Sequence, residues 1–240
     1  MTSFTGRLGE SAEHYDIAPL GDAAVLVRLG EGLIEQAVVE RVWAACELIR
    51  DAVTAGVADV VPAYDTVLVR FDPKVVGMAT ILACVRGALL GSLSGRQMAP
   101  RRFRVGVCFD DESGPDIGDV CEQLQISAQQ LVERFCAAHY RVAFLGYTAG
   151  FPYMLGLPAS LAVSRLGTPR RRVAMGSVAI AAGQCGIYPR ATPGGWRLIG
   201  RTGGEVFSAG QTPPALFAPG DAVDFFRADS LQVATVTQSA

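Results

Sequence analysis

The sequence predicts a two-domain protein of the α+β class, in which a small α/β domain is followed by a domain built mainly from strands. Up to residue 90, short β-prone runs alternate with two amphipathic helical patterns, whereas after Tyr140 short apolar runs are separated by Gly and Pro. A linker-like stretch, "GSLSGRQMAPR" (residues 91–101), separates the two patterns. We therefore expect a polar N-terminal leader over residues 1–15, the α/β domain over residues 16–95 and the strand-rich domain over residues 96–240.

The elements of the first domain follow from its hydrophobic periodicity. Short apolar runs rich in β-branched residues predict strands, and apolar residues that recur every three or four positions predict helices. The resulting order, β-α-β-β-α-β, is typical of a ferredoxin-like unit. Strands are expected at residues 23–29, 57–62, 65–71 and 103–109, and helices at residues 34–54 and 78–89.

The second domain is expected to begin with two helices, in "GPDIGDVCEQLQ" and "SAQQLVERFCA". Ser127 and Gln130 have the spacing of a capping box at the start of the second helix. From Tyr140 onward, "YRVAFLGY", "VAMGSVAIAAG", "WRLIGRT" and "DAVDFF" predict short strands between turns. This pattern is typical of a small β-barrel or sandwich.

Composition and the cysteine pattern narrow the class of protein. Half of the residues are apolar and 18% are charged, and no apolar run reaches the roughly 18 residues that cross a bilayer. Because the N-terminus also lacks an apolar secretory core, we expect a cytoplasmic protein. None of the six cysteines forms a C-x-x-C pair and only two histidines are present, so we expect reduced cysteines and no metal site.

Charge is distributed unevenly along the chain. Residues 135–204 contain no Asp or Glu, and such a basic region has three interpretations. The arginines form a solvated surface, they pair with acids from elsewhere in the fold, or some of them bind a phosphate or carboxylate, which Arg grips in bidentate fashion. Nucleic acid is disfavoured, because the N-terminal part is acidic and aromatic residues are not interleaved with basic ones. The arginines of this region are Arg141, Arg165, Arg170, Arg171, Arg172, Arg190, Arg197 and Arg201.

Two common catalytic motifs are missing. The sequence has no G-x-x-x-x-G-K-[ST] phosphate loop, which excludes conventional P-loop binding of ATP. It has no G-x-S-x-G nucleophile elbow either: Ser177 follows a glycine in "MGSVAIA", but the second glycine is absent. A serine-histidine triad is therefore not expected.

Three segments are candidates for a binding site. In the first, "FLGYTAGFPYMLGLP" (residues 144–158), Gly146 and Gly150 can turn backbone N–H groups toward a ligand. The rings of Tyr147, Phe151 and Tyr153 can form the walls of a pocket. The alternative is a packed loop with core aromatics.

The second segment is "GTPRRRVAMGSVAIAAGQCGIYP" (residues 167–189), with Arg170 just before a strand and Gln184 in a Gly-flanked turn. The third is "YPRATPGGWRLIGRT" (residues 188–202). Its Pro-Gly-Gly corner is expected to present Trp196 beside Arg197 or Arg201, at a pocket mouth or a partner interface, with a plain turn as the alternative.

These segments, in this order, resemble the family of the B subunit of 5-oxoprolinase, also called allophanate hydrolase subunit 1 or the kinase-A-inhibitor family. The block "QCGIYPRATPGGWRLIGRT" matches the family pattern almost completely. Weaker similarity in "LGDAAVLVRL", "VVPAYDTVLVRFDP" and "GPDIGDV" extends the resemblance from about Tyr15 to Arg227. The resemblance implies a small α/β N-terminal domain and a cyclophilin-like β-barrel of the carboxyltransferase C/D type.

The resemblance also implies a function and a set of site residues. The expected function is that of one member of an ATP-dependent complex that opens 5-oxo-L-proline to L-glutamate. Its partners would be the A subunit of this complex and the C subunit (allophanate hydrolase subunit 2-like), with ATP and Mg²⁺ shared with the partner. Arg165, Arg170 and Arg201 are the expected anion contacts, Gln184 and Tyr188 would orient the substrate, Gly146 and Gly150 would offer backbone donors, and Trp196 would lie at the pocket.

The sequence departs from the family pattern at several positions. Phe135 occupies the place of a family histidine, five residues before Tyr140. Ala149 and Ser164 replace prolines of the pattern, and "VAMGS" stands for V-P-A-G-S. Two alternatives stay open for this reason: a regulatory binding protein of the sensor-kinase-inhibitor type without catalysis, and a subunit of an allophanate or urea amidolyase-type complex.

Overall fold

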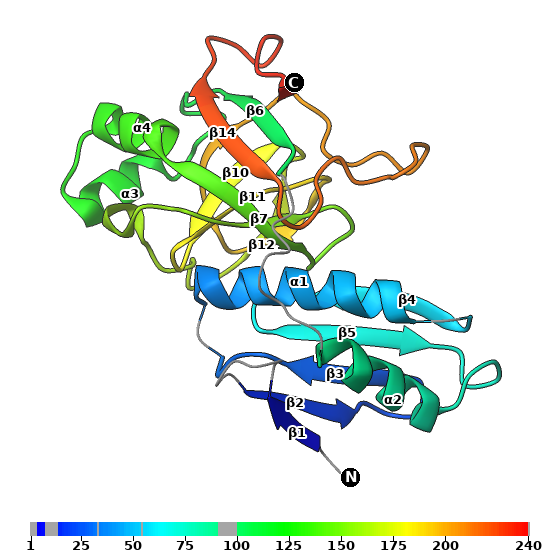
Figure 1. Cartoon of the computed structure of the whole chain (residues 1–240). Coiled ribbons are helices and arrows are strands. Elements are labelled where there is room, and N and C mark those ends of the chain that lie inside the picture. Colours follow the sequence, from blue (N-terminus) through cyan, green and yellow to red (C-terminus); the bar gives the residue numbers. More distant parts are fainter. Residues whose placement is uncertain (1–3, 8–13, 33, 54, 91–99, 240) are drawn as a thin grey trace. The chain divides into compact units, whose positions relative to one another are not determined.

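The computed structural model describes residues 4–7, 14–32, 34–53, 55–90 and 100–239 (Figure 1). The chain divides into two compact units, residues 1–99 and 100–240. Among the described residues, no helix combines the length and the apolar character that crossing a membrane requires.

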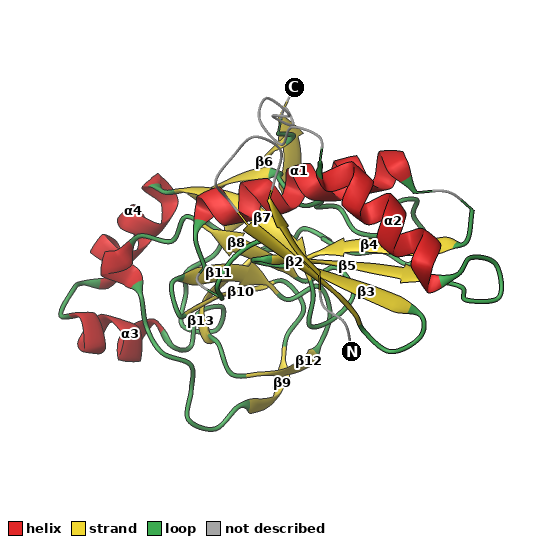
Figure 2. Cartoon of the chain, turned by 60° about the horizontal axis from the view of Figure 1, so that its bottom comes forward, coloured by secondary structure: helices red, strands yellow, loops and turns green. Residues whose placement is uncertain are grey.

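The first unit is an antiparallel sheet covered by two helices. Helices α1 (Gln36–Ala52) and α2 (Met78–Leu89) lie next to each other on one face of the sheet (Figure 2). Strand alternation turns Val25, Val27, Val67 and Val69 toward these helices, where all four are fully buried. The sheet has the order β1-β2-β3-β5-β4, with β1 (Phe4–Arg7), β2 (His14–Pro19), β3 (Ala24–Arg28), β5 (Thr66–Phe71) and β4 (Val57–Pro62).

Both predicted helices of this unit are present, but the ferredoxin-like description is not confirmed. The predicted strand at residues 103–109 appears as β6 (Arg102–Val107), and it belongs to the sheet of the second unit. Strand β3 pairs with β5 along one edge and with β2 along the other, and β2 pairs with β1. Part of the expected leader therefore forms strands. The hydrophobic periodicity of a segment predicts that it forms a strand, but it does not predict which sheet the strand joins. Residues 1–3 and 8–13 of the leader, and residues 91–99 of the expected linker, lie outside the described residues.

The second unit is built on an eight-stranded mixed sheet of order β13-β10-β11-β8-β7-β14-β6-β15. Strands β14 and β6 are parallel, and the other pairs are antiparallel. Strands β9 and β12 form a separate two-stranded ladder. The bounds are β7 (His139–Leu145), β8 (Pro152–Leu155), β9 (Arg170–Val173), β10 (Ser177–Ala181), β11 (Gln184–Ile187), β12 (Thr192–Gly194), β13 (Arg197–Arg201), β14 (Ala222–Arg227) and β15 (Val236–Ser239), with helices α3 (Ile117–Leu124) and α4 (Ala128–Ala137) and the short 3₁₀ helix η1 (Ala159–Leu161).

A closed barrel is not confirmed, because the ladders between described strands leave β13 and β15 at the two ends of the sheet. One isolated bridge joins the chain beyond β6 to β13: Cys108 and Arg201 exchange two backbone hydrogen bonds of 2.9 Å each. The class of the fold, mixed α and β with a strand-rich second half, is as predicted.

Helix α4 starts where the sequence predicts. The backbone N–H of Gln130 donates to Ser127 Oγ at 3.1 Å, and the Ser127 N–H donates to Gln130 Oε1 at 2.9 Å. This capping box satisfies N–H groups that the first helical turn leaves unpaired. The helix then buries Leu131 and Phe135 in the core of the second unit.

Candidate functional site

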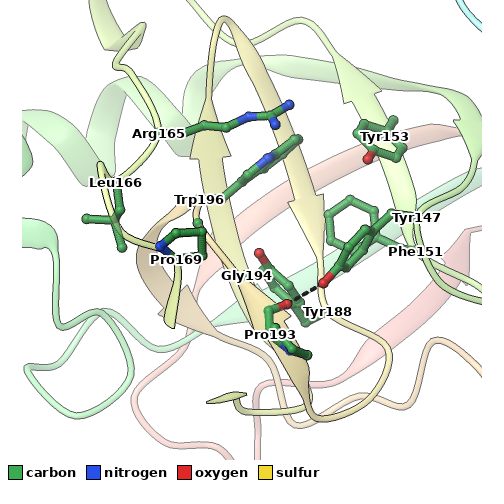
Figure 3. A pocket seen from close by; sticks show the side chains of 11 residues that line it. Tyr147, Phe151, Tyr153, Arg165, Leu166, Pro169, Tyr188, Pro193, Gly194 and Trp196 are labelled. Carbon is green, nitrogen blue, oxygen red and sulfur yellow. Dashed lines mark hydrogen bonds between the residues drawn. The ribbon is translucent and has the colours of Figure 1, made fainter. Parts of the chain in front are cut away.

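The three candidate segments meet at one pocket in the second unit, with a volume of about 270 Å³ (Figure 3). The first segment contributes rings, and the third contributes the turn that precedes β13. The loop between η1 and β9 supplies the remaining side. The lining residues are Tyr147, Phe151, Tyr153, Arg165, Leu166, Pro169, Tyr188, Pro193, Gly194, Gly195 and Trp196.

Phe151 is the centre of the aromatic walls. Its ring lies edge-to-face against Trp196, with centroids 5.6 Å apart, and against Tyr188, with centroids 5.1 Å apart. It makes similar contacts with Tyr147 and Tyr153. Such pairs contribute about 0.5–1.5 kcal/mol each beyond the area that they bury, so the walls are held by their own packing.

The Pro-Gly-Gly stretch is more than a turn. Thr192–Gly194 forms β12, which pairs with β9, and Trp196 follows it with only 6% of its surface exposed. A Cβ atom at Gly194 would lie 2.3 Å from the hydroxyl oxygen of Tyr188. Glycine at this position therefore lets the backbone pack directly on the Tyr188 ring.

Two side-chain contacts tie the first segment to the third. The Tyr147 hydroxyl donates to the carbonyl oxygen of Pro193, as the dashed line in Figure 3 marks, and lies 3.2 Å from Thr192 Oγ1. Arg190 Nε donates to Thr148 Oγ1 at 2.8 Å. Tyr147 has a backbone φ of +62°, an uncommon conformation for a bulky residue. This geometry holds its ring at one side of the pocket while 58% of the residue stays exposed.

Arg165 supplies positive charge at the pocket. Figure 3 shows its side chain next to that of Trp196, both extending toward Tyr153. Arg165 is exposed, and within the described part of the chain its side chain has no hydrogen bond or ion pair. No acidic residue is among those that line the pocket. The site can therefore receive an anionic group without displacing an internal partner.

Tyr188 and Tyr153 stay protonated at neutral pH. Burial raises the pKa of Tyr188 to about 12, although the charge of Arg165 and a hydrogen bond from the backbone N–H of Trp196 oppose the shift. Burial also raises the pKa of Tyr153, against the effect of Arg165. Tyr188 is therefore a hydrogen-bond donor under physiological conditions.

The arginine beside Trp196 is Arg165, and the expectation that it would be Arg197 or Arg201 is not met. Arg197 Nε donates to the Ser164 carbonyl oxygen at 3.4 Å, and the Arg197 guanidinium lies 3.5 Å from Asp119. Arg201 Nε donates to the Met175 carbonyl oxygen at 3.0 Å. Neither arginine lines the pocket.

Arg170 is paired with an acid from elsewhere in the fold. Its Nη2 lies 2.6 Å from Oδ1 of Asp116, which is 3% exposed and lies just before α3. For this residue the structure favours the interpretation in which arginines of the acid-free region find carboxylates outside it. Arg170 does not line the pocket.

Gln184, Gly146 and Gly150 do not line this pocket either. Gln184 is 5% exposed in β11, where it pairs with Ala181. The N–H of Gly146 donates to the Phe151 carbonyl oxygen at 3.1 Å, and Gly150 takes a φ of +78°. Both glycines border a separate surface depression formed by residues 145–150. Of the eight predicted site residues, the pocket brings together Arg165, Tyr188 and Trp196.

Sequence reasoning missed Leu166 and Pro169 on the wall of the pocket, and Asp116 behind it. Leu166 and Pro169 are apolar and carry no chemical signal. Asp116 lies in "GPDIGDV", one of the blocks with weaker similarity to the family pattern. The signal that could have found it is the excess of arginine after residue 135, which requires acids from other parts of the chain.

Phe135 lies in the core rather than at the pocket. It is 0% exposed and packs against Phe109, Tyr140 and Phe225, with centroid distances of 6.0, 5.2 and 4.8 Å. Tyr140 donates its hydroxyl to the Phe135 carbonyl oxygen at 3.0 Å. The aromatic side chain therefore fills a well-packed interior position.

All six cysteines are free thiols. Within the described ranges, no group of three or more His, Cys, Asp or Glu side chains is arranged to hold a metal ion.

Comparison with known proteins identifies similar chains. The family model described as "Carboxyltransferase domain, subdomain C and D" matches residues 15–217. The B subunit of 5-oxoprolinase from Bacillus subtilis (strain 168) is 34% identical, over 89% of this chain and 92% of the relative. The crystal structure of TTHA0988 matches with a TM-score of 0.75 at 31% identity, over 87% of this chain, which spans only 40% of the TTHA0988 chain. The urea carboxylase of Kluyveromyces lactis has a similar fold, with a TM-score of 0.72 at 19% identity, over 96% of this chain and 24% of that one.

Proposed function

The chain belongs to the family of the carboxyltransferase domain, subdomain C and D, and on that premise we propose that it is the B subunit of an ATP-dependent complex that opens 5-oxo-L-proline to L-glutamate. Relatives that are named as the B subunit of 5-oxoprolinase match over most of the chain and support this proposal. The observation that carries it is the position of Arg165 at an aromatic pocket, without an acidic partner among the described residues.

The chemistry of the pocket suits this substrate. 5-Oxoproline is a small five-membered lactam with one carboxylate. The rings of Phe151 and Trp196 offer apolar surface to the flat lactam ring, and Arg165 is placed to pair with the carboxylate. A substrate with a flat ring and a carboxylate contacts both the aromatic rings and Arg165. A neutral amide such as urea has no carboxylate and leaves Arg165 unpaired.

Tyr188 provides a means of orienting the lactam. Its phenol keeps its proton, because burial raises its pKa to about 12. The Tyr188 side chain lines the pocket, and its protonated hydroxyl can donate a hydrogen bond to a carbonyl oxygen there. The resulting role is substrate positioning, which contributes to the rate by fixing the geometry of the reacting group.

The residues that line the pocket do not fit a complete site for Mg²⁺ and ATP. Hard cations prefer carboxylate oxygens, and no acidic residue lines the pocket. The acidic residue behind the pocket, Asp116, is already engaged with Arg170. We therefore propose that activation of the lactam by ATP requires the assembled complex, with the carboxylate oxygens for Mg²⁺ supplied from outside this pocket.

The proposed partners are the A and C subunits of this complex. The relatives carry the name of one subunit of a larger enzyme, and this chain spans 40% of TTHA0988, whose chain contains much further sequence. The assembled complex is therefore the material in which activity is to be measured.

The test is reconstitution with purified partner subunits. Phosphate release from ATP and formation of glutamate are measured with and without 5-oxo-L-proline, and with this chain present or omitted. We expect 5-oxoproline-dependent release of phosphate that requires this chain, and no stimulation by urea or allophanate. Stimulation by urea instead would favour an amidolyase complex, and stable binding to a sensor kinase without turnover would favour a regulatory protein.

A further inference from the structure

A single buried carboxylate joins two of the segments that form the pocket. Asp116 lies just before α3, outside the arginine-rich region, and its side chain is 4% exposed. Oδ1 accepts a hydrogen bond from Arg170 Nη2 at 2.6 Å, and Oδ2 accepts one from the backbone N–H of Leu198 at 2.7 Å. The backbone N–H of Asp116 donates to the Leu198 carbonyl oxygen at 3.1 Å. Asp116 thus makes three hydrogen bonds to two different strands.

Both strands carry residues of the pocket. Arg170 begins β9 and directly follows Pro169, and Leu198 lies in β13, two residues after Trp196. Because Asp116 holds β9 with one oxygen and β13 with the other, it sets the spacing between the Pro169 side and the Trp196 side of the pocket. The carboxylate itself does not line the pocket.

The chain before Asp116 is adapted to this contact. A Cβ atom at Gly114 would lie 2.6 Å from the Ile199 carbonyl oxygen, so glycine allows the segment before α3 to approach β13 closely. Arg170 has no second acid among the described residues, and its Nη1 is buried without a hydrogen bond. Loss of the Asp116 charge therefore leaves this guanidinium without a partner.

We propose that Asp116 is a positioning residue for the pocket: it holds β9 against β13 through Arg170 and the Leu198 amide, and so keeps Trp196 and Pro169 at the spacing that the ligand requires. The effect on the ligand rests on the proposed function, whereas the effect on the pocket does not. The experiment therefore measures the two separately.

The pocket is measured through Trp196. In a Trp43→Phe background, Trp196 is the single tryptophan of the chain, because the sequence contains two. Asp116→Asn keeps an acceptor for the Leu198 amide but removes the charge that holds Arg170. We expect it to raise the acrylamide quenching constant of Trp196 about threefold, because β9 no longer shields the indole. Asp221→Asn is the matched control: Asp221 is a buried acid of the same unit that pairs with Arg101 at 2.5 Å, and its loss should leave quenching unchanged.

The ligand is measured in the assembled complex, with 5-oxo-L-proline as the probe. We expect Asp116→Asn to raise the KM for 5-oxoproline about tenfold and to change kcat less, while Asp221→Asn leaves KM at the wild-type value. If the wild-type complex does not respond to 5-oxoproline, the proposed function fails, and the quenching of Trp196 still decides whether Asp116 positions the pocket.

A second variant guards against a folding defect at Asp116. Arg170→Gln removes the ion pair with Asp116 by changing the arginine instead of the acid. It should raise the quenching constant of Trp196 to a similar extent. The double variant should add little to either single change, because both remove one link. Unchanged quenching in both single variants, or an equal change in Asp221→Asn, would overturn the proposal.

Discussion

The indole of Trp196 meets the ring of Phe151 at an interplanar angle of 90°, with the two centroids 5.6 Å apart. Phe151 is 2% exposed, and four aromatic rings of the pocket contact it. The pocket walls therefore depend on one interior ring that precedes β8, where a loop and a short strand meet.

Replacing Phe151 with a smaller side chain should lower both the stability of the fold and the affinity of the pocket for its ligand. We expect Phe151→Ala to lower the free energy of unfolding by about 3–5 kcal/mol, and Phe151→Leu to lower it less, because leucine fills part of the cavity. Both variants should weaken binding of 5-oxoproline, as titration calorimetry can measure. The control is Phe217→Leu, at a buried ring that packs on Phe103 away from the pocket: it should lose stability and keep its affinity.

Arg165 should affect binding without affecting stability. Because its side chain is exposed and has no ion pair among the described residues, Arg165→Ala is expected to change the free energy of unfolding by less than about 0.5 kcal/mol. The lost contact with a carboxylate should raise the KM for 5-oxoproline about 10- to 100-fold. Arg165→Lys keeps the positive charge, so its KM for 5-oxoproline should lie between those of the wild type and Arg165→Ala. Arg171→Ala, at an exposed arginine of β9, is the control, and an equal effect in that variant would point to general electrostatics instead.

Part of the site could be predicted from residue types. The sequence offers the rings of Tyr147, Phe151 and Tyr153 as possible pocket walls and names Tyr188 and Trp196 as site residues. All five line one pocket. The choice among arginines could not be predicted, because it depends on which of them find a partner. Arg170 pairs with Asp116, whereas Arg165 stays free at the pocket within the described residues.

The fold was predictable in its elements more than in their pairing. The helical pattern at residues 34–54 gave α1, and the capping-box spacing gave the start of α4. Strand β6 was predicted as a strand but assigned to the wrong sheet. Its alternating apolar pattern suits any sheet with a buried face, and only tertiary contacts, here parallel pairing with β14, decide among them.

Tyr188 should make stability depend on alkaline pH. Burial raises its pKa to about 12, compared with about 10 in the unfolded chain. Between these two values the unfolded state binds fewer protons than the folded state, so the free energy of unfolding falls as the pH rises. We expect a loss on the order of 2 kcal/mol between pH 10 and pH 12, measured as the difference between the wild type and Tyr188→Phe in urea titrations. Equal slopes for the two proteins would contradict this assignment. Below pH 9, the two proteins should show the same dependence of stability on pH, because Tyr188 keeps its proton in both the folded and the unfolded state.

Tyr147 should control access to the pocket. Tyr147→Phe removes the hydroxyl that bonds the Pro193 carbonyl oxygen and contacts Thr192, at a cost of about 1 kcal/mol in stability. Since the loop is then tied to the third segment mainly by Arg190 and Thr148, we expect faster ligand dissociation in stopped-flow measurements. Thr148→Ala removes that second tie and serves as a comparison. Dissociation rates equal to the wild type in both variants would show that the loop does not limit access.

Restoring the histidine of the family pattern at position 135 should not raise the activity of the assembled complex. Phe135 is fully buried among Phe109, Tyr140 and Phe225, and none of these four residues lines the pocket. Phe135→His replaces an apolar ring with a polar one, so we expect a loss of about 1–3 kcal/mol in stability. The interior disfavours the charged imidazole and lowers its pKa below the unfolded value of about 6.5, and the loss should therefore grow as the pH falls below 6.5. Denaturation at pH 8 and pH 5.5 measures this change. A rise in 5-oxoproline-dependent phosphate release by the variant complex, with stability intact, would instead show that the histidine acts from within the core.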